Sequence, residues 1–151
     1  MRINKKILFK IEKFCSTQER CIFDIIKKLN SWEVKNDQNL IIEHLTKNNF
    51  LDEQRFSNTF STGKFNIKKW GKIRISFELK KRNIKSIVIK NSLEKIDNEK
   101  YIATIRELIN KKYSTINEKD VFKKKSKTVQ YLYQKGYETN LVWKLINEEI
   151  K

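Results

Sequence analysis

Few side chains in this 151-residue sequence have the chemistry to make or break bonds. His44 is the only histidine, and on an ordinary amphipathic stretch such a residue is far more often a surface or core side chain than a general base. Cys15 and Cys21 could join His44 as metal ligands, but their spacing matches no common zinc knuckle and a fourth ligand is not evident. No glycine-rich phosphate loop is present. The sequence therefore predicts a protein that is not an enzyme and has no metal or other cofactor.

The strongest functional pattern is a run of basic residues interleaved with apolar ones between Lys64 and Arg82. A single acid, Glu78, stands among eight basic residues, which are Lys64, Lys68, Lys69, Lys72, Arg74, Lys80, Lys81 and Arg82. Basic side chains on a rigid helix suit contacts with a phosphate backbone, because each neutralised phosphate releases counterions. The alternative is a solvated lysine face on a lysine-rich protein.

These charges need a rigid support, and the run itself suggests one. A helix over residues 66–81 would place Trp70, Ile73 and Phe77 on one face and Ile75 nearly opposite, so we expect apolar contacts on two sides. Trp70 is therefore expected in the core rather than stacked on a base.

Three further residues belong to the same support. Phe56 and Phe65, with Trp70, are expected to fix the helix that presents the charges, and Gly71 completes this motif.

A second basic cluster opens the expected eighth helix. It comprises Lys119, Lys123, Lys124, Lys125 and Lys127, opposed only by Glu118 and Asp120. Positive charge near a helix N-terminus is electrostatically unfavourable, which favours a functional reason for it. A solvated surface is again the alternative.

Composition points to a folded, all-α protein with a polyanionic partner. The formal net charge of +16 would cost self-repulsion unless phosphates or carboxylates relieved it, although lysine-rich composition alone gives the same count. Nine Phe, five Tyr and three Trp can fill a core, so disorder throughout is not expected. Three Gly and no Pro leave little of the turn chemistry that sheets require, so helices joined by short polar turns remain.

The opening residues carry no membrane or secretory signal. Their longest apolar run, in MRINKKILFKIEKF, has only three residues, too few for either a secretory core or a membrane span. We therefore expect a cytoplasmic protein that does not enter membranes, with its two cysteines reduced and facing apolar neighbours.

Apolar residues of helical period predict nine helices, over residues 3–13, 17–29, 38–47, 53–61, 66–81, 86–95, 98–111, 118–134 and 139–149. Side-chain oxygens that could cap their N-termini are those of Ser16 with Glu19, Asp52, Ser86, Asp97, Asn117 with Asp120, and Thr139. Gly136 is placed to end a helix in the left-handed conformation.

Internal repetition organises these helices. Apolar pairs five residues apart straddle three tight breaks, namely Leu29 with Val34, Leu79 with Ile84, and Leu132 with Tyr137. Further apolar pairs follow at matching positions, namely Leu40 with Leu45, Val88 with Leu93, and Leu141 with Ile146. The stretches 52–56 and 97–101 correspond in a second register.

The repetition predicts three tandem three-helix units, over residues 1–51, 52–96 and 97–151. One unit of this size buries too little surface to be stable alone, so the units are expected to stack into one elongated, curved array with a face free for a partner.

With these features in place, the chain resembles the RecX family, bacterial regulators of the RecA recombinase. The stretches that carry the resemblance, in order along nearly the whole chain, are 15–20, 50–56, 63–65, 68–71, 75–84 and 131–137. The resemblance implies three helix-turn-helix-like repeats that bind in the groove of a RecA-type filament on single-stranded DNA. There the protein would restrain ATP hydrolysis, strand exchange or filament growth.

The resemblance transfers no catalytic residues, and the high positive charge departs from many family members. That departure leaves open how much direct contact with single-stranded DNA matters here. We expect a monomer that occupies the recombinase filament, with regulation that is either inhibitory or stimulatory. The alternative is a stand-alone helix-turn-helix protein that binds duplex DNA in the absence of recombinase.

Overall fold

The computed structural model describes residues 3–151, which form nine helices and no strand. The helices are α1 (Lys5–Thr17), α2 (Ile22–Ser31), α3 (Gln38–Lys47), α4 (Glu53–Lys68), α5 (Lys72–Lys81), α6 (Ser86–Glu94), α7 (Asn98–Tyr113), α8 (Val121–Gln134) and α9 (Thr139–Glu149). The predicted all-α architecture is confirmed.

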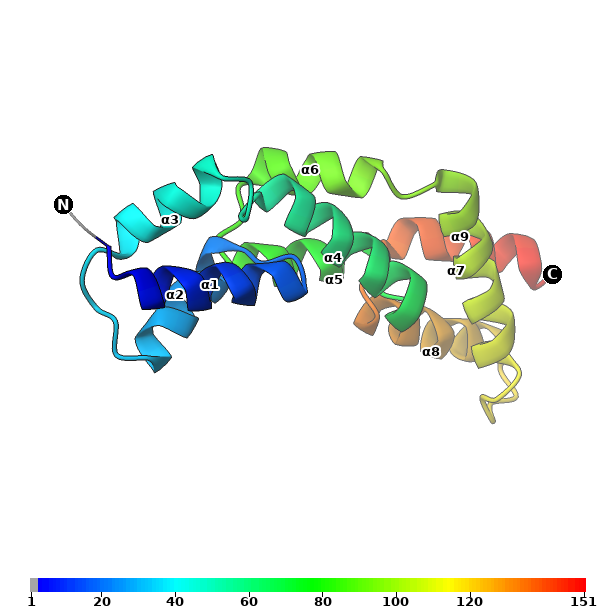
Figure 1. Cartoon of the computed structure of the whole chain (residues 1–151). Coiled ribbons are helices and arrows are strands. Elements are labelled where there is room, and N and C mark those ends of the chain that lie inside the picture. The colour runs from blue at the N-terminus through cyan, green and yellow to red at the C-terminus, as the bar shows by residue number, and fades with distance from the viewer. Residues whose placement is uncertain (1–2) are drawn as a thin grey trace.

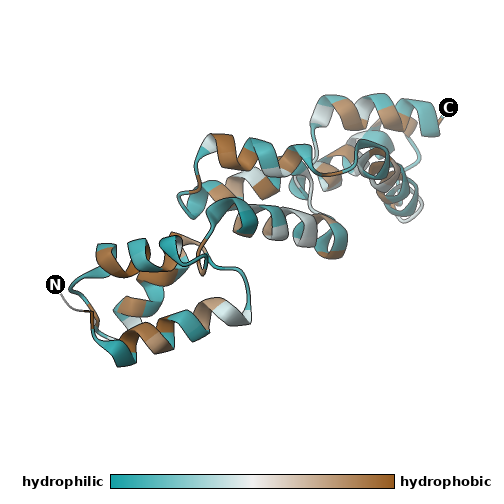
Figure 2. Ribbon diagram, turned by 45° about the horizontal axis from the view of Figure 1, so that its top comes forward, coloured by the Kyte–Doolittle hydropathy of each residue, from teal (hydrophilic) through white to brown (hydrophobic). Residues whose placement is uncertain are grey.

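Three helix triplets follow one another along an elongated molecule, with the chain ends at opposite extremities (Figure 1). We call α1–α3, α4–α6 and α7–α9 repeats 1, 2 and 3. Hydrophobic and hydrophilic segments alternate along the helices of each repeat, as expected for amphipathic helices (Figure 2).

The same backbone device ends the second helix of every repeat. In each, a backbone N–H reaches back five residues to a carbonyl oxygen: Val34 to Leu29 at 2.9 Å, Ile84 to Leu79 at 3.2 Å, and Tyr137 to Leu132 at 3.1 Å. The residue before each donor is left-handed, with φ of 61° at Glu33, 58° at Asn83 and 97° at Gly136. This is the hydrogen-bond pattern of a Schellman motif. The pairs that revealed the repeat in the sequence are therefore three copies of one helix end.

Two hydrophobic cores lie inside this array. One joins repeats 2 and 3 around Ile75, Leu79, Tyr101 and Leu132, and takes in Cys21 from repeat 1. The other lies within repeat 1. Its buried members are Ile11, Cys15, Ile25, Leu29, Ile41, Leu45 and Leu51. Repeats 2 and 3 thus share a core, whereas repeat 1 has its own.

The predicted caps are confirmed at two aspartates that precede helices and at one glycine that follows a helix. The carboxylates of Asp52 and Asp97 accept backbone N–H groups of α4 and α7, and Gly136 is left-handed as expected. The prediction of a capping box at Ser16 and Glu19 is wrong.

Ser16 instead lies in the last turn of α1, where its hydroxyl donates to the Lys13 carbonyl at 2.7 Å. The box stands at Cys21, whose N–H donates to the Asp24 carboxylate at 3.1 Å, so α2 begins at Ile22 rather than at residue 17.

Three other predicted caps are displaced. Ser86 and Thr139 are first helical residues, and Asp120 rather than Asn117 caps α8.

The prediction of one helix over residues 66–81 is also wrong. α4 runs without interruption to Lys68, left-handed Lys69 ends it, and α5 begins at Lys72. Trp70 and Gly71 therefore lie in a turn. This turn is fixed from outside the repeat, because Gly71 N–H donates to the Lys135 carbonyl at 2.8 Å.

Repeats 1 and 2 meet through polar contacts. The Glu53 carboxylate accepts the Ile22 N–H at 3.0 Å, and the Arg55 guanidinium donates to Glu19 at 2.6 Å and to the Asn49 carbonyl at 3.1 Å. These bonds join the first turn of α4 to the start of α2, to the turn between α1 and α2, and to the turn that precedes α4 itself.

Candidate nucleoprotein-binding surface

Helix α5 carries four of the eight basic residues predicted between Lys64 and Arg82, and its buried side is a single stripe. Ile75 and Leu79 are fully buried, whereas Ile73 is 50% exposed and Phe77 is 60% exposed. The predicted apolar contacts on two sides are therefore wrong, because the face that holds Ile73 and Phe77 is open to solvent. The helix lies at the surface, and the face that holds Ile73 and Phe77 is open to a partner.

The basic residues of α5 do not share one face of the helix. Arg74 and Arg82 lie on the side of α4, over the rings of Trp70 and Phe60. Other basic residues face α6, where Lys72, Lys80 and Lys90 line a common hollow. The helical period separates these sets, because residues two apart point about 200° apart around a helix.

Repeat 2 holds its first set of charges against aromatic rings in the seam between α4 and α5. Lys64 Nζ lies 4.9 Å from the centroid of the Trp70 ring, and Arg74 Cζ lies 4.2 Å from the same centroid. Arg82 Cζ lies 4.9 Å from the Phe60 centroid. Trp70 is therefore half-buried between two cations and packs against the core of repeats 2 and 3, so its ring is not a free stacking platform.

The equivalent seam recurs between the first and second helices of the other repeats. In repeat 1 the contacts are Lys10 and Lys28 over Trp32 at 4.2 and 5.6 Å, and Arg20 and Lys28 over Phe14 at 3.7 and 5.2 Å. In repeat 3 they are Lys112 and Lys135 over Tyr131 at 4.6 and 5.9 Å, and Lys124 over Tyr113 at 4.4 Å. We call these three rows the cationic seams.

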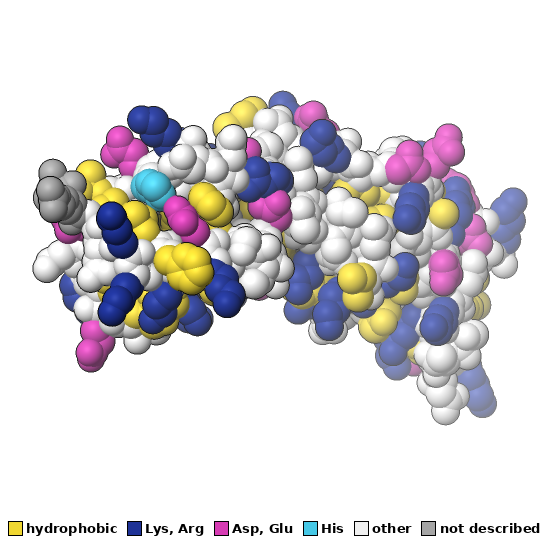
Figure 3. Space-filling model, in the orientation of Figure 1, with side chains coloured by type: hydrophobic (Ala, Val, Ile, Leu, Met, Phe, Trp, Pro, Cys, Tyr) yellow, Lys and Arg dark blue, Asp and Glu magenta, His cyan; other side chains and the backbone are white. Residues whose placement is uncertain are grey.

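The seams present charge that the protein itself leaves largely unneutralised. Arg82 is the one seam cation with a carboxylate within 4.0 Å among the described residues, and its Glu78 partner is 3.9 Å away. Ring contacts restrain long basic side chains and lower the entropy lost when they meet an anion. In Figure 3, basic side chains alternate with hydrophobic ones along the edge below α1 and α4. Such an edge suits a polyanion.

Lys68 and Lys69 lie outside the seams, and their backbone carbonyls bond to repeat 3. The Lys68 carbonyl accepts from Lys135 Nζ at 3.2 Å, and the Lys69 carbonyl accepts from the Tyr137 hydroxyl at 2.8 Å. Burial lowers the pKa of Lys135, and the nearby Arg74 charge lowers it further. Lys135 was missed from the sequence. Its position three residues after Leu132, matching that of Arg82 after Leu79, was the available signal.

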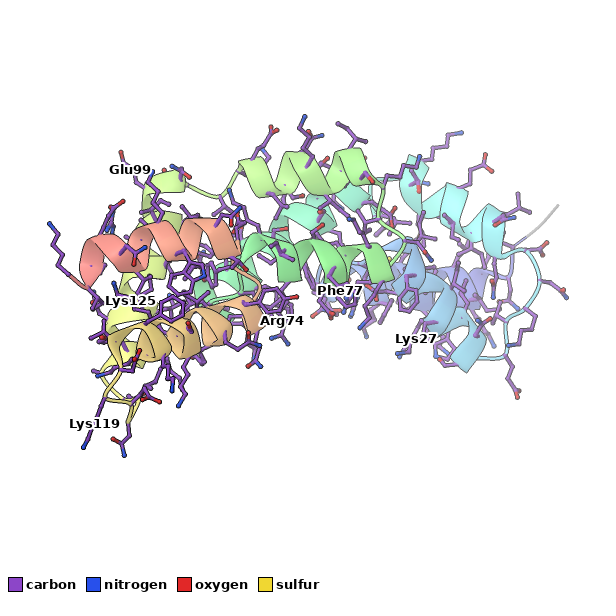
Figure 4. The ribbon with its side chains drawn as sticks, turned by 180° about the vertical axis from the view of Figure 1, so that it is seen from behind. Lys27, Arg74, Phe77, Glu99, Lys119 and Lys125 are labelled. Carbon is purple, nitrogen blue, oxygen red and sulfur yellow. The ribbon has the colours of Figure 1, made fainter. Side chains whose placement is uncertain are left out.

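The predicted α8 cluster also disperses. Only Lys124 lies in a seam, while Lys125 Nζ donates to the Asn147 side chain at 3.0 Å and Lys127 pairs with Glu118 at 3.2 Å. Lys123 is exposed, and its backbone N–H is capped by the Asp120 carboxylate at 2.9 Å. Lys119 is exposed in the preceding loop. Figure 4 shows the wide separation of Lys119 and Lys125.

The supporting aromatic residues connect this surface to the core. Phe56 and Phe65 are buried, and the Phe65 ring lies 5.6 Å from that of Tyr101. The Tyr101 hydroxyl accepts the Lys72 N–H at 3.0 Å and donates to the Glu138 carboxylate. Burial, then the bond to Glu138, raises the pKa of Tyr101, so this phenol stays protonated and can serve both bonds.

The residues first considered for bond chemistry are placed in structural roles. His44 Nε2 lies 2.7 Å from the Glu12 carboxylate, which joins α3 to α1. Burial raises the pKa of the Cys15 thiol to about 11 and that of Cys21 to about 12, which disfavours the reactive thiolate. Across residues 3–151, no group of three or more His, Cys, Asp or Glu side chains could hold a metal ion. None of the described helices is long and apolar enough to cross a membrane.

Two family models match the chain, one over most of repeat 2 and the other over most of repeat 3. Residues 52–93 match the second three-helix domain of RecX, and residues 99–146 match the third.

Curated relatives carry the same description. The regulatory protein RecX of Clostridium acetobutylicum is 36% identical over 115 residues, which are 74% of this chain and 51% of the relative. That of Clostridium tetani is 30% identical over 129 residues, covering 84% of this chain and 57% of the relative. In Clostridium beijerinckii the identity is 28%, over 98% of this chain and 68% of the relative. The chain spans about half the length of several of the curated relatives it matches.

Two solved structures share the fold. The crystal structure of regulatory protein RecX superposes with a TM-score of 0.85 at 21% identity, over 95% of this chain and 72% of that chain. The crystal structure of RecX from Lactobacillus salivarius gives a TM-score of 0.85 at 19% identity, over 95% of this chain and 94% of that chain. The matched three-helix domains, the relatives and this common architecture agree with the resemblance carried by the sequence motifs, and the chain belongs to the RecX family of regulatory proteins.

Proposed function

We propose that this protein binds a RecA-type recombinase filament on single-stranded DNA and restrains its ATPase and strand-exchange activities by occupancy. The observation that supports the proposal most directly is the cationic seam, repeated in each of three stacked units. A filament repeats its charges and protomers along an axis, so an elongated array with a repeated charge pattern can contact several protomers at once. The protein acts as a cytoplasmic monomer in this proposal.

Electrostatics supports the polyanionic part of the partner. The chain has 34 Lys and Arg against 18 Asp and Glu, and only six ion pairs join Lys or Arg to a carboxylate within the described residues. Counterion release on binding phosphates would therefore contribute strongly, and binding would weaken as salt rises. The seam aromatics already carry cations on their rings, which favours backbone contacts over base stacking.

The deciding experiment is recombinase ATPase on single-stranded DNA with increasing amounts of this protein at two salt concentrations. We expect inhibition at amounts up to equimolar with recombinase, weaker at the higher salt. A seam variant carrying Lys64→Glu and Arg74→Glu should need about tenfold more protein for half of the effect, because two restrained cations become repulsive.

The matched control carries Lys47→Glu and Lys95→Glu, the same charge change at exposed residues ending α3 and α6. It should act nearly as the unaltered protein does. Absence of any effect of the unaltered protein at equimolar amounts would overturn the proposal. Tight binding to a particular duplex sequence without recombinase would instead support the stand-alone helix-turn-helix alternative.

A further inference from the structure

A cleft between repeats 1 and 2 shares only Arg82 with the cationic seams. Its volume is about 580 Å³, one wall is formed by α2 and the other by the turn between α5 and α6, and Glu53 of α4 also lines it. The cleft is thus built by segments that are far apart in sequence. Pockets between separately folded units are frequent binding sites for ligands and peptides.

The two walls of this cleft differ in chemistry. The α2 wall is apolar, with Ile22, Ile26 and a Phe23 side chain that is 40% exposed. An exposed phenylalanine beside two isoleucines leaves apolar surface in contact with water that a partner could cover.

The rim and opposite wall are cationic. Lys27, Arg82 and Lys85 line the cleft, and neither lysine has a carboxylate within 4.0 Å among the described residues. The one acid of the cleft is engaged already, because the Glu53 carboxylate accepts the Ile22 N–H at 3.0 Å. Three basic side chains therefore surround an apolar wall, and one bonded carboxylate opposes them.

We propose that this cleft receives a short acidic segment of a partner protein, anchored by one bulky apolar side chain. The apolar anchor covers Phe23 and Ile26, while carboxylates on either side of it meet Lys27 and Lys85. A nucleic acid backbone satisfies only half of this pattern, since its phosphates offer nothing apolar to the α2 wall. The proposal rests on the proposed function, in which the DNA carries a protein coat, and it assigns the cleft to that coat.

The position of the cleft gives this contact a mechanical consequence. A segment seated here touches repeat 1 through α2 and repeat 2 through the α5–α6 turn, and these repeats have separate hydrophobic cores. In Figure 4, Lys27 and Phe77 mark α2 and α5 on the side seen from behind. An occupied cleft therefore fixes the angle between repeats 1 and 2, and with it the relative position of their seams.

The test uses the ¹⁵N-labelled full chain and the synthetic peptide Glu-Glu-Leu-Phe-Glu-Glu as the probe. We expect chemical-shift changes confined to α2, Glu53 and residues 82–85. Phe23→Ser, at a partly exposed position, should weaken peptide binding about tenfold, as should the double change Lys27→Glu with Lys85→Glu. The control pair Lys47→Glu with Lys95→Glu should change the affinity less than about twofold, since these charges lie outside the cleft and contribute little to peptide binding.

Several results would overturn the cleft as a peptide site. These are equal binding of Glu-Glu-Ser-Ser-Glu-Glu, shifts spread over the whole chain, or a short oligothymidylate that gives the same shifts and displaces the peptide. The two cleft variants also separate this inference from the proposed function. If both variants inhibit recombinase ATPase as the unaltered chain does, the inference fails alone, whereas peptide binding without any ATPase effect leaves the proposed function to fail alone.

Discussion

Two glycines decide how repeat 2 meets repeat 3. A Cβ atom on Gly71 would lie 2.3 Å from the Gly136 carbonyl oxygen, and one on Gly136 would lie 2.3 Å from the Arg74 Cβ. Gly136 also has a positive φ, which other residues adopt at a cost. The close approach lets Gly136 accept the Ile73 N–H at 3.0 Å. Any side chain here would push the turn that carries Trp70, and the start of α5 that carries Arg74, away from repeat 3.

Gly71→Ala should therefore destabilise the protein by about 3 kcal/mol, because the new methyl group meets backbone atoms that cannot move aside. Urea unfolding followed by circular dichroism measures the change. Gly63→Ala is the matched control, since nothing lies within 4 Å of its Cβ position inside α4. That control should stabilise the protein by about 0.5–1 kcal/mol. Equal effects of the two changes would show that the glycine contact is not tight.

At the scale of the element, α5 depends on groups outside its own repeat. Its first turn has no side-chain cap, and the N–H groups there are accepted by the Lys135 carbonyl, the Tyr101 hydroxyl and the Gly136 carbonyl. Free N–H groups at a helix start must find partners somewhere. Repeat 3 supplies them, so the helix that presents Arg74 is positioned by its neighbour.

Tyr101→Phe tests this dependence. Without the hydroxyl, the Lys72 N–H and the Glu138 carboxylate each lose a partner, so unfolding should become easier by about 1–3 kcal/mol. Hydrogen exchange at the Lys72 amide should accelerate more than at amides in the middle of α5. Tyr133→Phe serves as the control, because that ring is 56% exposed. A Tyr101→Phe protein as stable as the Tyr133→Phe protein would argue against capping between repeats.

At the scale of the whole molecule, the three repeats are not joined equally. Repeats 2 and 3 share one continuous core, whereas repeat 1 has its own core and joins repeat 2 through the buried Cys21 and through polar contacts. In stacked-repeat proteins, stability is set by each unit and by its interface with the next. The weaker junction is the one that carries the cleft.

Native-state hydrogen exchange in low urea should show this asymmetry. We expect core amides of α1–α3 to open with a free energy at least about 2 kcal/mol lower than those of α4–α9, because partial unfolding follows cooperative units. Amides of repeats 2 and 3 should respond to urea together, which provides an internal reference. A single opening free energy across all nine helices would contradict two separately cooperative parts.

Local sequence patterns determined much of this architecture. The apolar pairs at Leu29, Leu79 and Leu132 predicted a repeated helix end, because left-handed termination and burial recur with the same local spacing. Aspartates at positions 52 and 97 were sufficient to mark helix starts. The family resemblance also came from local motifs.

Tertiary structure alone decided where the candidate binding charges lie. The break at residues 69–71 is held by carbonyls of repeat 3 more than sixty residues away, a contact with no local signature. Once α5 begins at Lys72, its lysines and arginines divide between the α4 and α6 sides instead of forming one ridge. Lys135 lies close enough to Arg74 to feel its charge because two glycines let their backbone segments approach closely. Sequence specifies periodicity, but the side to which a charge points depends on distant backbone atoms that set where each helix begins.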